Sequence, residues 1–105
     1  MDKEISTLEA SKLLNEEACL LLDVREPDEL EICAISGARH IPMMEIPERM
    51  AEIPKNMPLV VFCHHGMRSM KVLQFLTTRG YDQVFNLKGG IDAWALSVDT
   101  KMPRY

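Results

Sequence analysis

The sequence alternates short, wholly apolar runs with longer segments in which apolar residues recur at helical spacing. Unbroken apolar runs are typical of parallel strands buried on both faces, because a strand with one solvated face alternates apolar and polar residues instead. Parallel strands also need long crossover connections, which the helical segments provide. The pattern therefore predicts the α/β fold class, with a five-stranded, mainly parallel sheet and helices on both faces.

Two apolar runs stand out as strands. The clearest is Leu59–Phe62, and Cys19–Val24 is predicted to be a central strand of the sheet. Ser6 and Glu9 form a capping box for the first helix, and Pro42 has no N–H to donate, which places its strand at a sheet edge. The remaining strands are expected at residues 4–5, 39–42 and 84–87, and the helices at 6–15, within 25–30, at 45–50, at 69–79 and from 89 onward.

Length and charge limit the possible organisation and partners. The chain has 105 residues, of which 47% are hydrophobic and 27% charged. Because a separate core needs on the order of 100 residues, we expect residues 1–105 to form one domain. Twelve Lys and Arg against 16 Asp and Glu leave a net charge of −4, which argues against a nucleic-acid partner. Basic residues exceed acidic ones only after residue 54, so an anion site is expected in the second half.

Cysteine usage and hydropathy suggest a compartment. The three cysteines, Cys19, Cys33 and Cys63, form no CxxC pair, and an odd number fits a reducing environment better than a disulfide framework. The first residues are acidic where a signal peptide would be basic, and no apolar run approaches the about 18 residues of a membrane span. We therefore expect a cytoplasmic protein that does not enter a membrane.

The segment after the strand 59–62 carries the reactive groups. It reads Cys63-His64-His65-Gly66-Met67-Arg68-Ser69 and precedes a helix. At such a junction the inward-pointing amides and the helix N-terminus form an anion site, and Gly66 allows the unusual dihedrals of the loop. These groups favour a thiolate, so Cys63 is the predicted catalytic nucleophile. The predicted substrate-binding loop consists of the six following residues: His64, His65, Gly66, Met67, Arg68 and Ser69.

Several charged and thiol side chains allow two interpretations. Arg68 either faces the substrate anion or ties the loop to a carboxylate such as Asp23. Asp23 and Arg25 either serve as an acid and an anion binder, or form an ion pair that fastens the strand ends beneath the loop, which is the favoured interpretation. Cys19 and Cys33 have no cationic neighbours in the sequence and are expected to be structural.

The histidines beside Cys63 raise the question of a metal. Three adjacent residues do not match the spacing typical of zinc ligand pairs, and no fourth ligand is evident, so no metal site is expected. His64 and His65 either tune the charge of the loop or contribute only their backbones.

Four segments occur in order along nearly the whole chain: Leu21–Glu26, Ser36–Pro42, Cys63–Ser69 and Gly89–Trp94. In these segments the sequence resembles the rhodanese-like sulfurtransferases. The resemblance implies that Cys63 takes a sulfane sulfur from a small donor anion such as thiosulfate, holds it as a persulfide, and passes it to a thiol or to cyanide. It also implies that the amides of the loop cradle this sulfur and that no cofactor is required.

A weaker similarity concerns the residues around Cys33 and the ending Val98–Tyr105. Both are similar to the rhodanese domains of enzymes that activate and sulfurate ubiquitin-like proteins. This similarity adds a sulfur-carrier protein to the candidate acceptors.

Two alternatives remain open beside the sulfurtransferase. Small cysteine-dependent phosphatases and arsenate-type reductases have one residue more between cysteine and arginine than the four that separate Cys63 from Arg68. The smaller loop favours sulfur over phosphate. A non-catalytic rhodanese-like binding module is the other alternative, and such modules commonly lack the cysteine.

Overall fold

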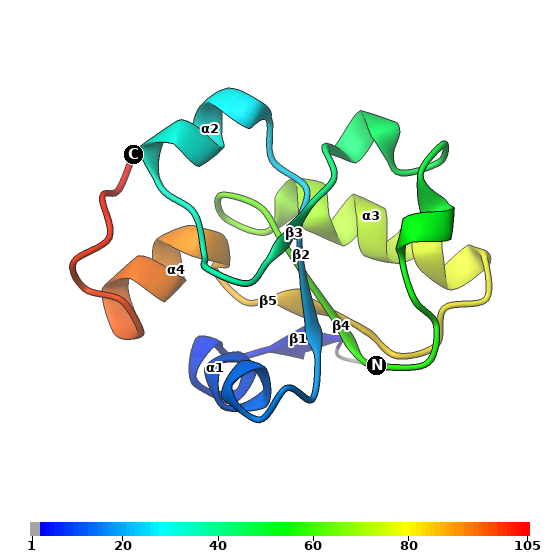
Figure 1. Ribbon diagram of the computed structural model, residues 1–105, viewed down its shortest axis with the longest axis horizontal. Coiled ribbons are helices and arrows are strands. Elements are labelled where there is room, and N and C mark those ends of the chain that lie inside the picture. The colour runs from blue at the N-terminus through cyan, green and yellow to red at the C-terminus, as the bar shows by residue number, and fades with distance from the viewer. Residues whose placement is uncertain (1–2) are drawn as a thin grey trace.

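The computed structural model describes residues 3–105 as one five-stranded sheet with helices on its two faces (Figure 1). The sheet order is β1-β5-β4-β2-β3, and every strand pair is parallel within the described residues. The predicted α/β fold class is thus confirmed. The strands are β1 (Glu4–Ile5), β2 (Leu20–Asp23), β3 (Arg39–His40), β4 (Leu59–Phe62) and β5 (Val84–Leu87).

Within residues 3–105, four α-helices and two short 3₁₀-helices accompany the strands, and α4 follows the last of them. The helices are α1 (Thr7–Asn15), α2 (Pro27–Ile32), η1 (Met43–Glu45), η2 (Met50–Glu52), α3 (Met67–Thr78) and α4 (Gly90–Ser97). Within residues 3–105, no helix is long and apolar enough to cross a membrane.

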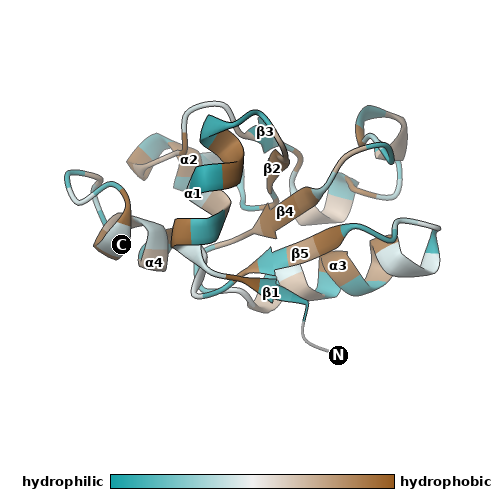
Figure 2. Ribbon diagram, turned by 90° about the horizontal axis from the view of Figure 1, so that it is seen from below, coloured by the Kyte–Doolittle hydropathy of each residue, from teal (hydrophilic) through white to brown (hydrophobic). Residues whose placement is uncertain are grey.

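The central strand β4 shows why the sheet is buried on both sides. All four of its residues are at most 1% exposed, and they divide between two core clusters. Leu59 and Val61 pack with α3 residues such as Leu76, while Val60 and Phe62 pack with α1 and α4 residues on the opposite face. The strand is accordingly hydrophobic along its length in Figure 2, whereas the covering helices also carry hydrophilic residues.

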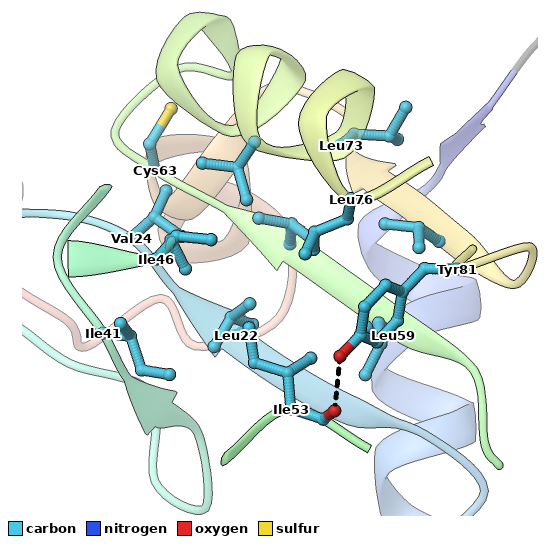
Figure 3. Packing of buried hydrophobic residues seen from close by; sticks show 13 residues of the cluster. Leu22, Val24, Ile41, Ile46, Ile53, Leu59, Cys63, Leu73, Leu76 and Tyr81 are labelled. Carbon is cyan, nitrogen blue, oxygen red and sulfur yellow. Dashed lines mark hydrogen bonds between the residues drawn. The ribbon is translucent and has the colours of Figure 1, made fainter. Parts of the chain in front are cut away.

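The first core cluster also receives the segment between β3 and β4. In Figure 3, Ile46 and Ile53 lie in this cluster beside residues of β2, β4 and α3, and the Tyr81 hydroxyl donates a hydrogen bond of 2.7 Å to the Ile53 carbonyl. The long connection is thereby fixed against the sheet despite its lack of a full helix.

Several predicted element bounds differ from the structure, among them the strand expected at Cys19–Val24, which the structure has as Leu20–Asp23. The helix expected at 45–50 is wrong: the segment forms η1 and η2 instead, joined by a single turn in which the Arg49 N–H donates to the Glu45 carbonyl at 3.1 Å. Pro47 lies in that turn and has no N–H to donate to the Met43 carbonyl, so η1 does not extend into an α-helix. Pro42 lies beyond β3 rather than in it, and the N–H groups of Ile41 and Met43 on either side of it donate to the carbonyls of Asp23 and Val24. Helix α3 begins at Met67, two residues before the predicted start at Ser69.

Candidate active site

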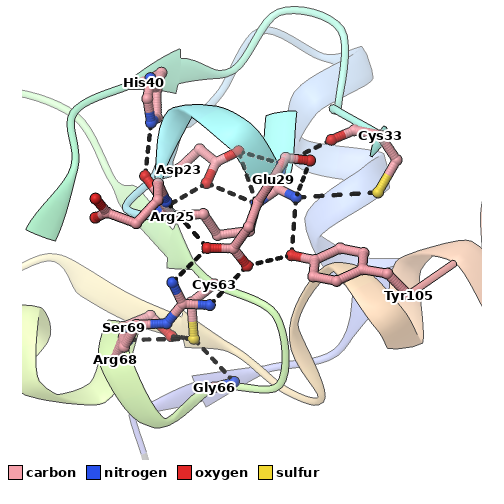
Figure 4. Close-up of polar contacts among 11 residues, drawn as sticks. Asp23, Arg25, Glu29, Cys33, His40, Cys63, Gly66, Arg68, Ser69 and Tyr105 are labelled. Carbon is pink, nitrogen blue, oxygen red and sulfur yellow. Dashed lines mark hydrogen bonds and ion pairs between the residues drawn. The ribbon is translucent and has the colours of Figure 1, made fainter. Parts of the chain in front are cut away.

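Cys63 lies directly after β4, where the chain turns into α3. Its Sγ accepts hydrogen bonds from the backbone N–H groups of Gly66, at 3.1 Å, and Ser69, at 3.4 Å (Figure 4). These amides belong to the first turn of a twelve-residue helix, whose N-terminus carries partial positive charge. The sulfur atom therefore occupies a position where negative charge is stabilised, and Cys63 itself is only 1% exposed.

Asn86 of β5 fastens this loop from below. Its Nδ2 donates to the carbonyl of Gly66 at 3.1 Å, and its Oδ1 accepts from the Ser69 hydroxyl at 2.5 Å. The Ser69 Oγ also lies 3.4 Å from the Cys63 Sγ. Because β5 pairs with β4, which leads into Cys63, the sheet places this buried amide beneath the loop. Gly66 adopts φ +119°, a conformation that L side chains rarely reach.

The N-terminus of α4 holds the other side of the loop. The N–H of Ile91 donates to the Cys63 carbonyl at 2.9 Å, and the N–H of Asp92 donates to the His64 carbonyl at 3.2 Å. Gly90 has φ +64°, and a Cβ added there would lie 2.3 Å from the His64 carbonyl oxygen. Only glycine therefore permits this close approach of helix and loop.

Arg68 ties the loop to α2. Its Nη1 and Nη2 donate to the Glu29 carboxylate at 2.6 and 2.9 Å, which is the bidentate geometry typical of guanidinium–carboxylate pairs. Of the two orientations left open by the sequence, the structure has the loop tie, and the carboxylate is Glu29 rather than Asp23. The Arg68 contact is the main reason that the pKa of Glu29 falls to about 2.

Asp23 and Arg25 form a buried ion pair behind the loop. The Arg25 Nη2 lies 2.7 Å from the Asp23 carboxylate, and the two side chains are 0% and 2% exposed. The same guanidinium donates to the Cys33 carbonyl at 2.9 Å and, more weakly, to the Glu29 carbonyl at 3.3 Å. The pair joins the end of β2 to the middle and to the C-terminal end of α2, so it supports the helix that holds Arg68.

The two histidines and Met67 have different surroundings. The His64 ring stacks on the Tyr105 ring, with ring centroids 3.9 Å apart and planes 8° from parallel. The centroid of the His65 ring also lies 3.9 Å from that of His64. Met67 is 80% exposed at the start of α3. Among residues 3–105, no group of three or more His, Cys, Asp or Glu side chains is placed to hold a metal ion.

The other two cysteines lack the environment of Cys63. Cys19 is buried just before β2, and desolvation raises the pKa of its thiol, which makes it a poorer nucleophile. Cys33 is buried at the end of α2, with its Sγ 4.0 Å from the Arg25 Nη1. Neither thiol lies at a helix N-terminus.

The Glu29–Arg68 contact predicts a pH dependence of stability. Because the pKa of Glu29 is lower in the folded chain than in the unfolded one, the pair stabilises the fold above about pH 4.3, and this stabilisation is lost as the pH falls toward 2. We expect Glu29→Gln to lower the free energy of unfolding at pH 6 and to change it little at pH 2. Urea unfolding across this range measures the difference. Glu31→Gln, on the exposed side of the same helix, is the control, and a Glu29→Gln deficit independent of pH would contradict the prediction.

The sequence did not identify four residues that shape this site: Glu29, Asn86, Gly90 and Tyr105. Asn86 carried a usable signal, because a polar residue within an otherwise apolar strand needs a buried partner. The two adjacent glycines at the start of α4 carried another, since glycine is the residue that allows a positive φ and a close backbone approach, and both have a positive φ in the structure. Glu29 and Tyr105 carried no comparable signal, because their partners lie 39 and 76 residues away.

Known proteins resemble this chain in sequence and in fold. The sequence matches the family described as Rhodanese-like domain over residues 6–97. A sulfurtransferase of Allochromatium vinosum is 43% identical over 86 residues, covering 82% of this chain and 80% of that protein. The thiosulfate sulfurtransferase GlpE of Coxiella burnetii is 36% identical over 94 residues, covering 90% and 88%. The crystal structure of a rhodanese-like domain protein from Staphylococcus aureus matches with a TM-score of 0.83 at 33% identity, covering 98% of each chain. These matches confirm the resemblance seen in the sequence, and the chain belongs to the rhodanese-like domain family.

Proposed function

We propose that the protein is a sulfurtransferase that carries a sulfane sulfur as a persulfide on Cys63. The observation that carries this proposal is the position of the Cys63 Sγ at the N-terminus of α3, where the N–H groups of Gly66 and Ser69 donate to it. The relatives named sulfurtransferase, which match most of the chain, support the same conclusion.

The first step loads the cysteine. The Cys63 thiolate attacks the outer sulfur of a donor such as thiosulfate, a new S–S bond forms to Sγ, and the S–S bond of the donor breaks with its electron pair leaving on sulfite. The amides that face Sγ remain in place through this step, so they stabilise the charge without rearranging.

The second step transfers the outer sulfur from Cys63 to the acceptor. A thiolate or cyanide attacks the outer sulfur of the persulfide, and the electron pair of the breaking S–S bond returns to Cys63 as the thiolate. The same two amides stabilise that leaving group. Neither step requires a metal or a dissociable cofactor.

The setting of Arg68 favours sulfur transfer over phosphate chemistry. A phosphatase needs its loop arginine to face the bound phosphate, whereas the Arg68 guanidinium is bound on both prongs by Glu29. Only four residues separate Cys63 from Arg68, so the loop also offers fewer amides to a bulky oxyanion.

The partners and location follow from the same chemistry. We assign a small sulfur-donor anion and a thiol or cyanide acceptor, with a sulfur-carrier protein as a macromolecular acceptor to be tested. All three cysteines are free, and a persulfide carrier needs a reduced thiol, which supports a cytoplasmic location.

Intact-mass measurement of the purified protein tests the proposal. After thiosulfate treatment we expect the mass to increase by one sulfur atom, and cyanide should remove that atom while thiocyanate appears. Hydrolysis of an aryl phosphate by the same preparation would favour the phosphatase alternative. A Cys63 that stays unmodified with thiosulfate and with a small alkyl persulfide would instead support a non-catalytic binding module.

A further inference from the structure

The segment after α4 returns to the active site and brings Tyr105 against it. In Figure 1 the end of the chain lies beside α2. Two contacts fix its course: the N–H of Met102 donates to the Asp99 carbonyl at 3.1 Å, and the Arg104 Nε donates to the Asp92 carboxylate at 2.8 Å. Met102 also packs against the second core cluster.

The hydroxyl of Tyr105 joins the polar contacts that hold the loop. It donates to the Glu29 Oε2 at 2.5 Å and accepts from the Arg25 Nη1 at 3.1 Å, as Figure 4 shows. Glu29 is the carboxylate that binds Arg68 on both prongs. Because the Tyr105 hydroxyl and the Arg68 guanidinium both donate to the Glu29 carboxylate, the hydroxyl of Tyr105 is coupled to the position of Arg68.

The ring of Tyr105 contacts the loop a second time, at His64. The two rings are stacked with centroids 3.9 Å apart. The centroids of the His64 and His65 rings are also 3.9 Å apart. The Nε2 of His64 is buried and has no hydrogen-bond partner among the described residues. The orientation of this imidazole therefore depends on ring packing rather than on a hydrogen bond at Nε2.

We propose that Tyr105 is a positioning residue for the Cys63 loop. Its ring touches His64, directly after Cys63, and its hydroxyl reaches Arg68 through Glu29, so one side chain restrains the loop near both ends. The amide of Gly66 that faces the sulfur lies between these two points. The consequence of this positioning for catalysis rests on the proposed sulfurtransferase function.

Hydrogen exchange on the full chain tests the positioning itself. In Tyr105→Leu, which loses ring and hydroxyl, we expect the amides of Gly66 and Ser69 to exchange about five- to thirty-fold faster, a range that corresponds to the loss of one or two ordinary contacts. The amide of Val61, in the centre of the sheet, should keep its rate. The ring protons of His64 should also shift downfield in the NMR spectrum, because the stacked ring above them is gone. Tyr105→Phe should retain this ring-current effect.

Two further variants keep the test decisive. Lys101→Ala, at an exposed position of the same segment, should leave both loop amides unchanged. Arg104→Ala removes the ion pair that holds this segment to Asp92, and we expect a smaller acceleration at the same two amides. Unchanged exchange at Gly66 and Ser69 in Tyr105→Leu, or equal acceleration at Val61, would overturn the proposal.

Sulfur transfer from thiosulfate to cyanide gives the functional readout. We expect kcat/KM to fall about five- to thirty-fold in Tyr105→Leu, and to stay within about threefold of the parent in Tyr105→Phe, where the stacked ring remains. Parent-like kcat/KM in Tyr105→Leu would overturn the catalytic part of the proposal. If the parent transfers no sulfur, the proposed function fails, while hydrogen exchange still decides whether Tyr105 positions the loop.

Discussion

Replacing Cys63 with serine is expected to abolish sulfur transfer, with a loss of at least about a thousandfold. A serine hydroxyl is a far weaker nucleophile than a thiolate, and it cannot hold sulfur as a persulfide. The substitution keeps the hydrogen-bonding contacts with Gly66 and Ser69 possible, so the loop should remain folded. Thiosulfate:cyanide sulfur transfer and intact mass after thiosulfate treatment measure the two losses separately.

The remaining cysteines provide matched controls for this prediction. Cys19→Ser and Cys33→Ser alter buried thiols that lie away from the N-terminus of α3, so each variant should keep most of its activity per folded molecule. Both should still gain one sulfur atom from thiosulfate. Transfer activity in folded Cys63→Ser, or its loss in both controls, would refute the assignment of Cys63.

The sheet was predictable because its signals are local. Leu59–Phe62 is apolar at every position, and a strand of that kind fits only a sheet covered on both faces. Pro27 at the first position of α2 and the contact of Ser6 with the amide of Glu9 likewise appear where the sequence places them. Pro47 shows the limit of such signals: a short helix was expected at 45–50, and the segment instead forms two 3₁₀-helices on either side of the turn that contains this proline.

The details of the site were less predictable because they depend on contacts between distant segments. The position of Cys63 between a strand and a helix is local and could be read directly. The orientation of Arg68 could not, since an arginine binds whichever carboxylate the fold brings near, and Glu29 belongs to α2, in the connection between β2 and β3. The stacking of Tyr105 on His64 depends on the path of the chain after α4, which no sequence periodicity describes.

Gly90→Ala is expected to cost about 2–5 kcal/mol of unfolding free energy and to disable the site. The estimate combines about 1–2 kcal/mol for an alanine at positive φ with about 1–3 kcal/mol for the steric conflict, since the Cβ would lie 2.3 Å from the His64 carbonyl oxygen at φ +64°. Urea unfolding measures the loss of stability.

The effect of Gly90→Ala on sulfur transfer separates loop displacement from simple destabilisation. The conflicting atoms are the carbonyl groups of Cys63 and His64, so relieving the conflict must move the chain that carries the nucleophile. A displacement of about 1 Å in a reacting group can cost about a hundredfold in rate, and we expect a loss of about ten- to a hundredfold per folded molecule.

Gly37→Ala is the control: the φ of Gly37 is +89°, but the nearest neighbour of an added Cβ, a methyl group of Leu14, would lie 4.0 Å away. That variant should lose about 1–2 kcal/mol and retain parent-like sulfur transfer, because only the backbone penalty applies. Equal activities of the two folded variants would mean that the close approach of α4 does not position Cys63.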